Sequence, residues 1–139
     1  MLENTFFMVK PDGVSRGLEE IIFARVEEAG LKLIQKKKIL MAGDQAKDLY
    51  SPHLGKDFYA GLIKFITSGE VICGVVRGED AVARVRELMG ATDPRQADVG
   101  TIRGDLKEDT VVNSDGIIKN VVHGSDSPES AKREIAIFF

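Results

Sequence analysis

The chain contains a single cysteine, Cys73, and this scarcity limits its chemistry. One cysteine cannot form an internal disulfide, which fits a reducing cytosol. Cys73 lies in the apolar run 71–76, so we expect a buried and unreactive thiol. With only two histidines in addition, His53 and His123, the chain has too few ligands for a zinc site of the usual kind.

Long apolar runs and a strong net charge are also lacking. No apolar run approaches the ~20 residues that a membrane helix needs, and the first residues have no signal-peptide pattern. The formal net charge of −3 argues against nucleic-acid binding driven by bulk charge. No Gly-x-x-x-x-Gly-Lys-[Ser/Thr] loop occurs, so any phosphoryl transfer must use a device other than a P-loop. No spaced pair of acidic residues suits glycoside hydrolysis.

What is present is the composition of one ordinary globular domain. Of the 139 residues, 43% are apolar and 29% are charged, enough for a single hydrophobic core. No linker, repeat or low-complexity segment interrupts the chain. We therefore expect one domain over residues 1–139.

Apolar spacing predicts strands that alternate with helices. Strands are expected at 6–9, 31–41, 71–76 and 121–122, and helices at 18–29, 44–50, 59–66, 81–89 and 128–135. Residues 10–13 are expected to form a turn in which Asp12 makes a local side-chain bond, and residues 91–105 a loop. This order fits an α+β fold, a ferredoxin-like α/β sandwich in which helices cover one face of a four-stranded antiparallel sheet.

The most informative segment is 120–130, in which His123 closes a short β-branched run. Ser127 is then typical of a helix cap, Pro128 of the first helical position and Glu129 of the first turn. A helix N-terminus attracts anions through its free N–H groups and its dipole. Because imidazole is a nucleophile that is mostly neutral at cytosolic pH, the segment suggests a phosphate-accepting histidine. A structural histidine at a strand end is the alternative, and the commoner one.

Cations and aromatic residues elsewhere give weaker signals. Lys10 and Arg103 lie beside glycine-containing turns, where a cation can reach a phosphate without bulky neighbours. Arg86 lies off the apolar stripe of its predicted helix, and periodicity alone favours a surface arginine. Tyr50 and Phe58 flank a polar stretch; such rings can stack on a base, although core packing is the commoner use of phenylalanine. His53 is expected at the surface.

Three motifs together carry a resemblance: Lys10-Pro-Asp-Gly-Val14, Thr101-Ile-Arg-Gly-Asp105 and Asn120-Val-Val-His-Gly-Ser-Asp126. With all three present, the chain resembles the nucleoside diphosphate kinases over nearly its whole length. In that family a histidine takes the γ-phosphate from a nucleoside triphosphate and passes it to a nucleoside diphosphate, with ping-pong kinetics. The alternative is a nucleotide- or nucleic-acid-binding regulator on the same fold with little turnover. The complete set of matching site residues favours the enzyme.

The resemblance also implies roles for single residues. His123 matches the phosphate acceptor, and the residues that match nucleotide contacts are Lys10, Phe58, Arg86, Thr92, Arg103 and Asn120. Those expected to assist His123 in catalysis are Lys10, Tyr50, Asn120 and Glu134. In particular, Glu134 matches the glutamate that holds the imidazole, while Ser125 and Asp126 match neighbours that shape the site. Mg²⁺ would arrive with the nucleotide and bridge its phosphates, with Asp126 as a candidate ligand and no site held mainly by the protein.

The chain departs from this family pattern in two places. Segment 106–119 is longer than usual, and its apolar runs flank the turn-forming residues 113–116, which predicts an inserted hairpin. That hairpin would border the nucleotide mouth or extend a subunit contact. The chain also ends at Phe139 where many relatives continue, and we expect its apolar last residues to pack into the sheet or an interface. The family implies a cytoplasmic homo-oligomer built from dimers, a hexamer rather than a tetramer.

Overall fold

A computed structural model describes residues 1–139 and contains one antiparallel sheet of four strands. The strands are β1 (Leu2–Val9), β2 (Lys32–Ile39), β3 (Val71–Glu79) and β4 (Val122–Gly124), in the order β2-β3-β1-β4. The central strands β1 and β3 pair with Met8 opposite Cys73. On the other side of β1, His123 of β4 also lies opposite Met8. The predicted four-stranded antiparallel sheet is therefore confirmed.

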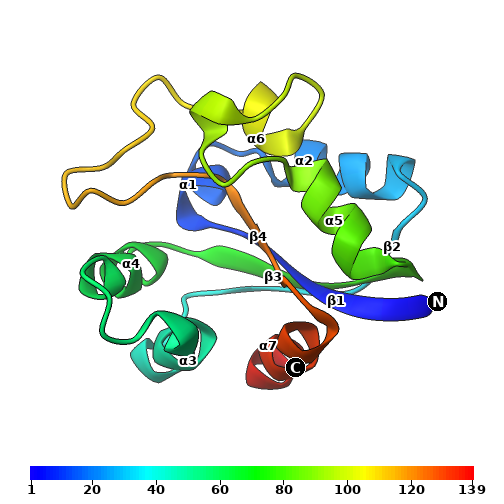
Figure 1. The fold of residues 1–139 in the computed structure, drawn as a ribbon, viewed down its shortest axis with the longest axis horizontal. Helices are drawn as coiled ribbons and strands as arrows, with labels where there is room; N and C mark the ends of the chain where they lie inside the picture. Colours follow the sequence, from blue (N-terminus) through cyan, green and yellow to red (C-terminus); the bar gives the residue numbers. More distant parts are fainter.

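Helices cover both faces of this sheet (Figure 1). One face carries α2 (Glu19–Glu28), α5 (Ala81–Met89) and α6 (Ile102–Asp105); the other carries α3 (Gly43–Leu49), α4 (Tyr59–Ile66) and α7 (Pro128–Phe138). The expectation that helices cover only one face is wrong. The reason lies in the continuous apolar run of β1: Phe7 and Val9 pack into one core, while Phe6 and Met8 pack into the other. A strand that is apolar on both sides must be covered on both sides.

Short helices replace the expected turn at 10–13 and part of the loop at 91–105. Pro11–Ser15 forms the one-turn helix α1, with a proline at its start. The expected loop contains a 3₁₀ turn, η2 (Pro94–Gln96), and α6. A second 3₁₀ turn, η1 (Ser51–His53), follows α3. Helices of a single turn are too short to show an apolar period, and their sequence signal is a cap such as Thr101, whose hydroxyl accepts from the Gly104 N–H at 3.1 Å.

The longer helices begin and end where their sequence signals indicate. In α7 the Ser127 hydroxyl accepts a hydrogen bond from the Ser130 N–H at 3.0 Å, and Pro128 follows the cap. Helices α2 and α5 are followed by Gly30 and Gly90, whose φ values of +84° and +87° suit a glycine that ends a helix. The longest helix, α7, has 11 residues, and no helix is long and apolar enough to cross a bilayer.

The segment between α6 and β4 folds into a hairpin that lies against α4 (Figure 1). Val112 and Ile118 form a single antiparallel bridge, and the Asn113 side chain accepts from the N–H groups of Asp115 and Ile117, each at 2.9 Å. Lys64 of α4 lies 3.3 Å from the Asp115 carboxylate. The Ile117 side chain packs so closely on Gly61 that a Cβ there would lie 3.1 Å from it.

Cys73 lies in the middle of β3 and is completely buried, as predicted. Burial raises the pKa of its thiol to about 12. The thiol is therefore protonated at neutral pH, which is the form with little nucleophilic reactivity.

Candidate functional site

Residues from several parts of the chain come together around β4, the strand that carries His123. Lys10 follows β1, Arg86 lies on α5, Arg103 on α6, Asn120 precedes β4, and Glu134 lies on α7. One link joins residues that are 110 positions apart: Lys10 Nζ donates to Asn120 Oδ1 at 2.8 Å. The antiparallel pairing of β1 with β4 produces this link, because it brings the end of β1 beside the start of β4.

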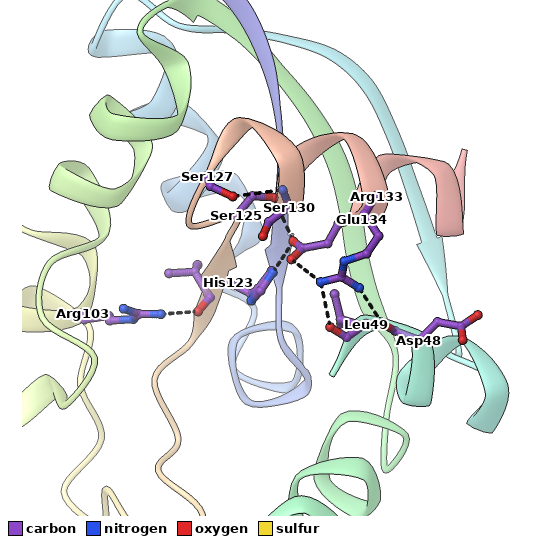
Figure 2. A network of polar contacts seen from close by, with 10 residues as sticks. Asp48, Leu49, Arg103, His123, Ser125, Ser127, Ser130, Arg133 and Glu134 are labelled. Carbon is purple, nitrogen blue, oxygen red and sulfur yellow. Dashed lines mark hydrogen bonds and ion pairs between the residues drawn. The ribbon is translucent and has the colours of Figure 1, made fainter. Parts of the chain in front are cut away.

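The imidazole of His123 points at the carboxylate of Glu134 (Figure 2). Nε2 lies 2.7 Å from Glu134 Oε1, and the Ser125 hydroxyl donates to the same oxygen at 2.8 Å. Glu134 is only 4% exposed, and a carboxylate in this position accepts a hydrogen bond from the Nε2–H group, which keeps the proton on that nitrogen. The opposite ring nitrogen, Nδ1, then keeps its lone pair and is free to act as a nucleophile.

Arg133 joins this carboxylate to the end of α3 (Figure 2). Its guanidinium donates to the carbonyl of Asp48 at 2.6 Å and lies 3.5 Å from Glu134 Oε2. The last carbonyls of a helix attract cations, so Arg133 is well placed to hold α7 against α3. Periodicity in the sequence gives no signal for this role, because the partner carbonyls belong to another helix.

The two aromatic residues that flank 51–57 have different environments. Tyr50 is 5% exposed, its ring meets the His123 ring edge-on at 6.3 Å, and its hydroxyl has no hydrogen-bond partner. Burial raises the pKa of that hydroxyl. Phe58, at the start of α4, is 43% exposed. Tyr50 thus packs beside the histidine, whereas Phe58 is partly exposed and has Lys56 Nζ over its ring, 5.7 Å from the centroid.

His53 is not the plain surface residue that the sequence suggests. Its ring is half-buried and lies 5.3 Å from the Phe58 ring and 6.2 Å from the Tyr50 ring. Burial, followed by the charge of Lys56, lowers the pKa of His53. Lys56 Nζ lies 3.2 Å from its Nδ1, a contact that suits a neutral imidazole. The sequence neighbours of His53, Pro52 and Leu54, do not predict this row of aromatic rings.

Two arginines supply positive charge at the site. Arg103 is buried and donates to the carbonyls of Asn120 at 3.1 Å, Val122 at 2.8 Å and Gly90 at 3.2 Å. Since a guanidinium has five N–H groups, two remain for a ligand. Burial and then the nearby charge of Arg86 lower the pKa of Arg103 to about 10. Arg86 is exposed, as periodicity suggested, yet its charge is close enough to lower the pKa of Arg103, and two neighbouring cations favour a bound anion.

Lys10 is a buried cation whose hydrogen-bond partner is neutral. Burial, and then the charge of Arg103, lower the pKa of Lys10 to about 8, while Asp12 opposes this shift. Its acceptor Asn120 in turn donates through Nδ2 to the carbonyl of Thr92 at 3.0 Å. The Thr92 side chain is exposed. The positive charge of Lys10 therefore remains available for an anionic ligand.

The arrangement defines a class of protein: an α+β sandwich that presents an oriented imidazole among cations, a geometry suited to accepting a phosphoryl group. Comparison with known proteins narrows this class. The family model for nucleoside diphosphate kinase matches residues 3–139. A nucleoside diphosphate kinase of Listeria monocytogenes is 49% identical over 99% of this chain and 89% of that protein, and one of Saccharolobus islandicus is 45% identical over 100% and 96%.

Solved structures of the same family agree with this match. One is a kinase of Halobacterium salinarum in complex with CDP, with a TM-score of 0.89 and 46% identity over 100% of this chain and 88% of that one. Another, from Borrelia burgdorferi, mimics the transition state with bound vanadate and ADP; its TM-score is 0.91, with 38% identity over 99% and 87%. The chain belongs to the nucleoside diphosphate kinase family, and it is an enzyme, a phosphotransferase. The resemblance indicated by the three motifs is confirmed.

Proposed function

We propose that this chain transfers the γ-phosphate of a nucleoside triphosphate to a nucleoside diphosphate through a phosphohistidine at His123. The observation that carries the proposal is the 2.7 Å contact between His123 Nε2 and Glu134 Oε1, beside the cations Lys10, Arg86 and Arg103. The Borrelia burgdorferi relative that holds vanadate and ADP as a transition-state mimic supports the same chemistry. Such a covalent intermediate divides one transfer into two similar steps, which gives ping-pong kinetics.

In the first step the lone pair of His123 Nδ1 forms a bond to the γ-phosphorus. The bond between that phosphorus and the β,γ-bridging oxygen breaks, and its electron pair leaves with the diphosphate product. In the second step a terminal oxygen of the incoming diphosphate attacks the same phosphorus, and the electron pair of the P–N bond returns to Nδ1. Glu134 keeps the Nε2 proton in place and balances the positive charge of the phosphorylated ring.

The cations and polar side chains act by position and charge. Phosphoryl transfer needs little covalent chemistry beyond the acceptor, so Lys10, Arg86 and Arg103 neutralise the charge on the phosphoryl oxygens. Thr92 contacts the phosphates, and Asn120 contacts the sugar and an oxygen near the reacting phosphate. Tyr50 packs beside the imidazole.

Phe58, which is 43% exposed, is proposed to stack on the base. Stacking does not depend on the pattern of donors and acceptors at the base edge. We therefore propose that the enzyme accepts several bases with similar efficiency. The relative from Halobacterium salinarum, whose structure contains CDP, supports the binding of nucleoside diphosphates.

Mg²⁺ is proposed as the cofactor, delivered by the nucleotide. The donor set fits this route: no group of three or more His, Cys, Asp or Glu residues gathers as a metal cage, whereas cations line the site and suit phosphates that carry the metal. Asp126 is exposed, and its carboxylate pKa is lowered by a Ser130 hydrogen bond and by Arg86. An ionised carboxylate in this place would complete the coordination of nucleotide-bound Mg²⁺, which shields phosphate charge.

The hairpin within 106–119 is proposed to border the nucleotide mouth of a kinase domain that spans residues 1–139. Its contacts with α4 support this role, because Phe58 lies at the start of that helix. Ile117 packs on Gly61, and Asp115 pairs with Lys64 at 3.3 Å. The hairpin and Phe58 would then form adjacent parts of one wall.

We also propose a cytoplasmic homo-oligomer built from dimers, with six chains rather than four. Exposed apolar side chains support the association of chains: Ile21 is 49% exposed, Ile34 40% and Leu40 65%. Ile34 lies on β2, an edge strand of the sheet. Edge strands and exposed apolar groups are surfaces that a second chain can cover. No nucleic acid or membrane is needed for the proposed activity.

The decisive experiment is incubation of the chain with γ-labelled ATP and Mg²⁺. We expect a label on the protein that is labile in acid and stable in base, and that disappears in His123→Ala. The matched control is His53→Ala, which removes the only other histidine and should leave that label in place. No label, or a label unaffected by His123→Ala, would overturn the proposal and favour the regulatory alternative.

A further inference from the structure

Val121 has a backbone conformation that a β-branched residue rarely adopts. Its φ is +71°, in the left-handed region, and its side chain is completely buried. The N–H of Val122 donates to the carbonyl of Asn120 at 2.7 Å, which closes a three-residue turn around Val121. A turn of this kind with positive φ is strained, and such strain in a non-glycine residue gathers at functional sites.

This strained turn lies between two proposed site residues. Asn120 is its first residue, and His123 follows its last residue directly. The direction in which the turn sends the chain therefore sets where the Asn120 amide and the His123 ring point relative to each other. A relaxed, extended Val121 would redirect one of the two side chains away from the other.

Lys10, which follows β1, and Asp12 of α1 hold this turn from one side. The Asp12 Oδ2 accepts a hydrogen bond from the Val121 N–H at 2.9 Å, and the Lys10 N–H donates to the Val121 carbonyl at 2.8 Å. Gly13 permits this close approach, because a Cβ there would lie 3.1 Å from the Val121 carbonyl oxygen and 2.7 Å from Val9. Both main-chain polar groups of the strained residue are thus held by one short segment.

Holding the Asp12 carboxylate in this position costs free energy, because the group is buried and only partly hydrogen-bonded. Asp12 is 6% exposed, and its second oxygen, Oδ1, has no hydrogen-bond partner. Burial raises its pKa, although Lys10 and the Val121 N–H oppose the shift. The sequence suggested a local turn bond for this residue, yet its partner is 109 positions away. Backbone strain and a partly unpaired buried acid are therefore found in one contact at the edge of the site.

We propose that Asp12 is a positioning residue for phosphoryl transfer. Its carboxylate holds the Val121 N–H, keeps the turn in its left-handed form, and so aims Asn120 and His123 into the same site. Asp12 itself touches no reacting atom. The proposal rests on the proposed function of His123, and it assigns the hydrogen-bond acceptor, rather than the negative charge, as the property that matters.

The test is single-turnover phosphorylation of His123 by γ-labelled ATP in the full chain. Asp12→Ala removes the acceptor, and we expect the rate constant at saturating ATP to fall roughly 10- to 100-fold, as for a small misplacement of reacting groups. The ATP concentration for half-saturation should change less than about threefold, because the turn governs orientation more than binding. Asp12→Asn keeps an acceptor oxygen without the charge, and should stay within about threefold of the wild-type rate.

Three outcomes separate this proposal from the proposed function and from a purely structural role. If the wild-type chain acquires no label on His123, the proposed function fails first. If the wild-type chain is labelled, either of two results would overturn the positioning role. One is a wild-type rate in Asp12→Ala, and the other is a loss of rate in Asp12→Asn as large as that in Asp12→Ala. Val26→Ala, in a buried position of α2, is the stability control: its melting temperature should fall while its rate holds. If Asp12→Ala does not fold, Asp12→Ser, whose hydroxyl is too short to reach Val121, should be slow in the same way.

Discussion

At the residue scale, the polar side chains that this protein buries are concentrated in one place. Seven polar or charged residues are buried, and all but Thr5 lie at the site or in contact with it: Lys10, Asp12, Arg103, Asn120, Ser125 and Glu134. Burying such groups costs free energy unless each finds a partner. Their concentration at one site indicates that function, more than stability, accounts for them.

Glu134 offers the sharpest test at this scale. In Glu134→Gln the side chain keeps its size, but its amide can donate to His123 Nε2 and drive the ring proton onto Nδ1, the attacking atom. We expect kcat to fall on the order of 10²-fold, with a smaller change in KM. Steady-state kinetics with ATP and a nucleoside diphosphate measures both. Glu129→Gln, an exposed change on the same helix, should keep wild-type values, and equal kinetics in the two variants would contradict the role of Glu134.

The lowered pKa of Lys10 leads us to expect that kcat/KM depends on pH in a particular way. Because its pKa is lowered to about 8, the free enzyme holds this side chain as a cation below that pH and loses the charge as the pH rises through it. Asp12 and Arg103 are its charged neighbours. The value of kcat/KM should therefore decline above about pH 8, since it reports groups of the free enzyme. In Lys10→Arg this decline should move to higher pH, whatever the overall rate; a profile of unchanged shape would contradict the assignment.

At the element scale, the site residues come from several different helices, each of which contributes one group. Glu134 lies on α7, Arg86 on α5, and Phe58 at the start of α4. The Ser127 cap of α7 and the Gly90 end of α5 are local signals that could be predicted from the sequence. The short α1 and α6 were not predicted, because one helical turn has no apolar period, and these two helices carry Asp12 and Arg103.

The role of the hairpin in nucleotide binding can be tested by replacing it. Replacing residues 110–118 by a short loop removes the wall that rests on α4, and we expect KM for nucleotides to rise several-fold while kcat changes little. Lys64→Ala removes only the 3.3 Å ion pair with Asp115, and should change KM less than about twofold, because exposed ion pairs contribute about 0–1 kcal/mol. If nucleotide KM and oligomer mass both stay unchanged after the replacement, the hairpin has neither of its expected uses.

At the scale of the whole molecule, helices on both faces of the sheet divide the interior into two cores. One contains Phe7 and the α2 and α5 side chains; the other contains Phe6, Phe138 and Tyr50. The second core extends directly under the site, because the Phe6 ring lies 5.8 Å from the His123 ring. The imidazole therefore packs against closely packed apolar side chains, which limits its motion.

The number of chains in the assembly can be tested by measuring its mass. We expect light scattering to give six times the 15.2 kDa of one chain, with a mass that stays constant on dilution into the micromolar range. The exposed apolar side chains of α2 and β2 supply the surface that association would bury. A mass equal to one chain would contradict the proposed assembly, and a mass of four chains would correct its number.

The longer helices and strands, the Ser127 cap and the family could be predicted from the sequence alone, because apolar period, capping chemistry and motifs are local patterns. The sequence also singled out His123 and, through the family resemblance, the residues expected around it. Three features could be found only in the folded chain: helices cover both faces of the sheet, His53 joins a row of aromatic rings, and the charge of exposed Arg86 lies near Arg103. The tertiary structure alone linked Asp12 to the strained Val121. The reason is physical: such contacts join residues far apart in the chain, and which groups meet depends on how the strands pair and the cores pack.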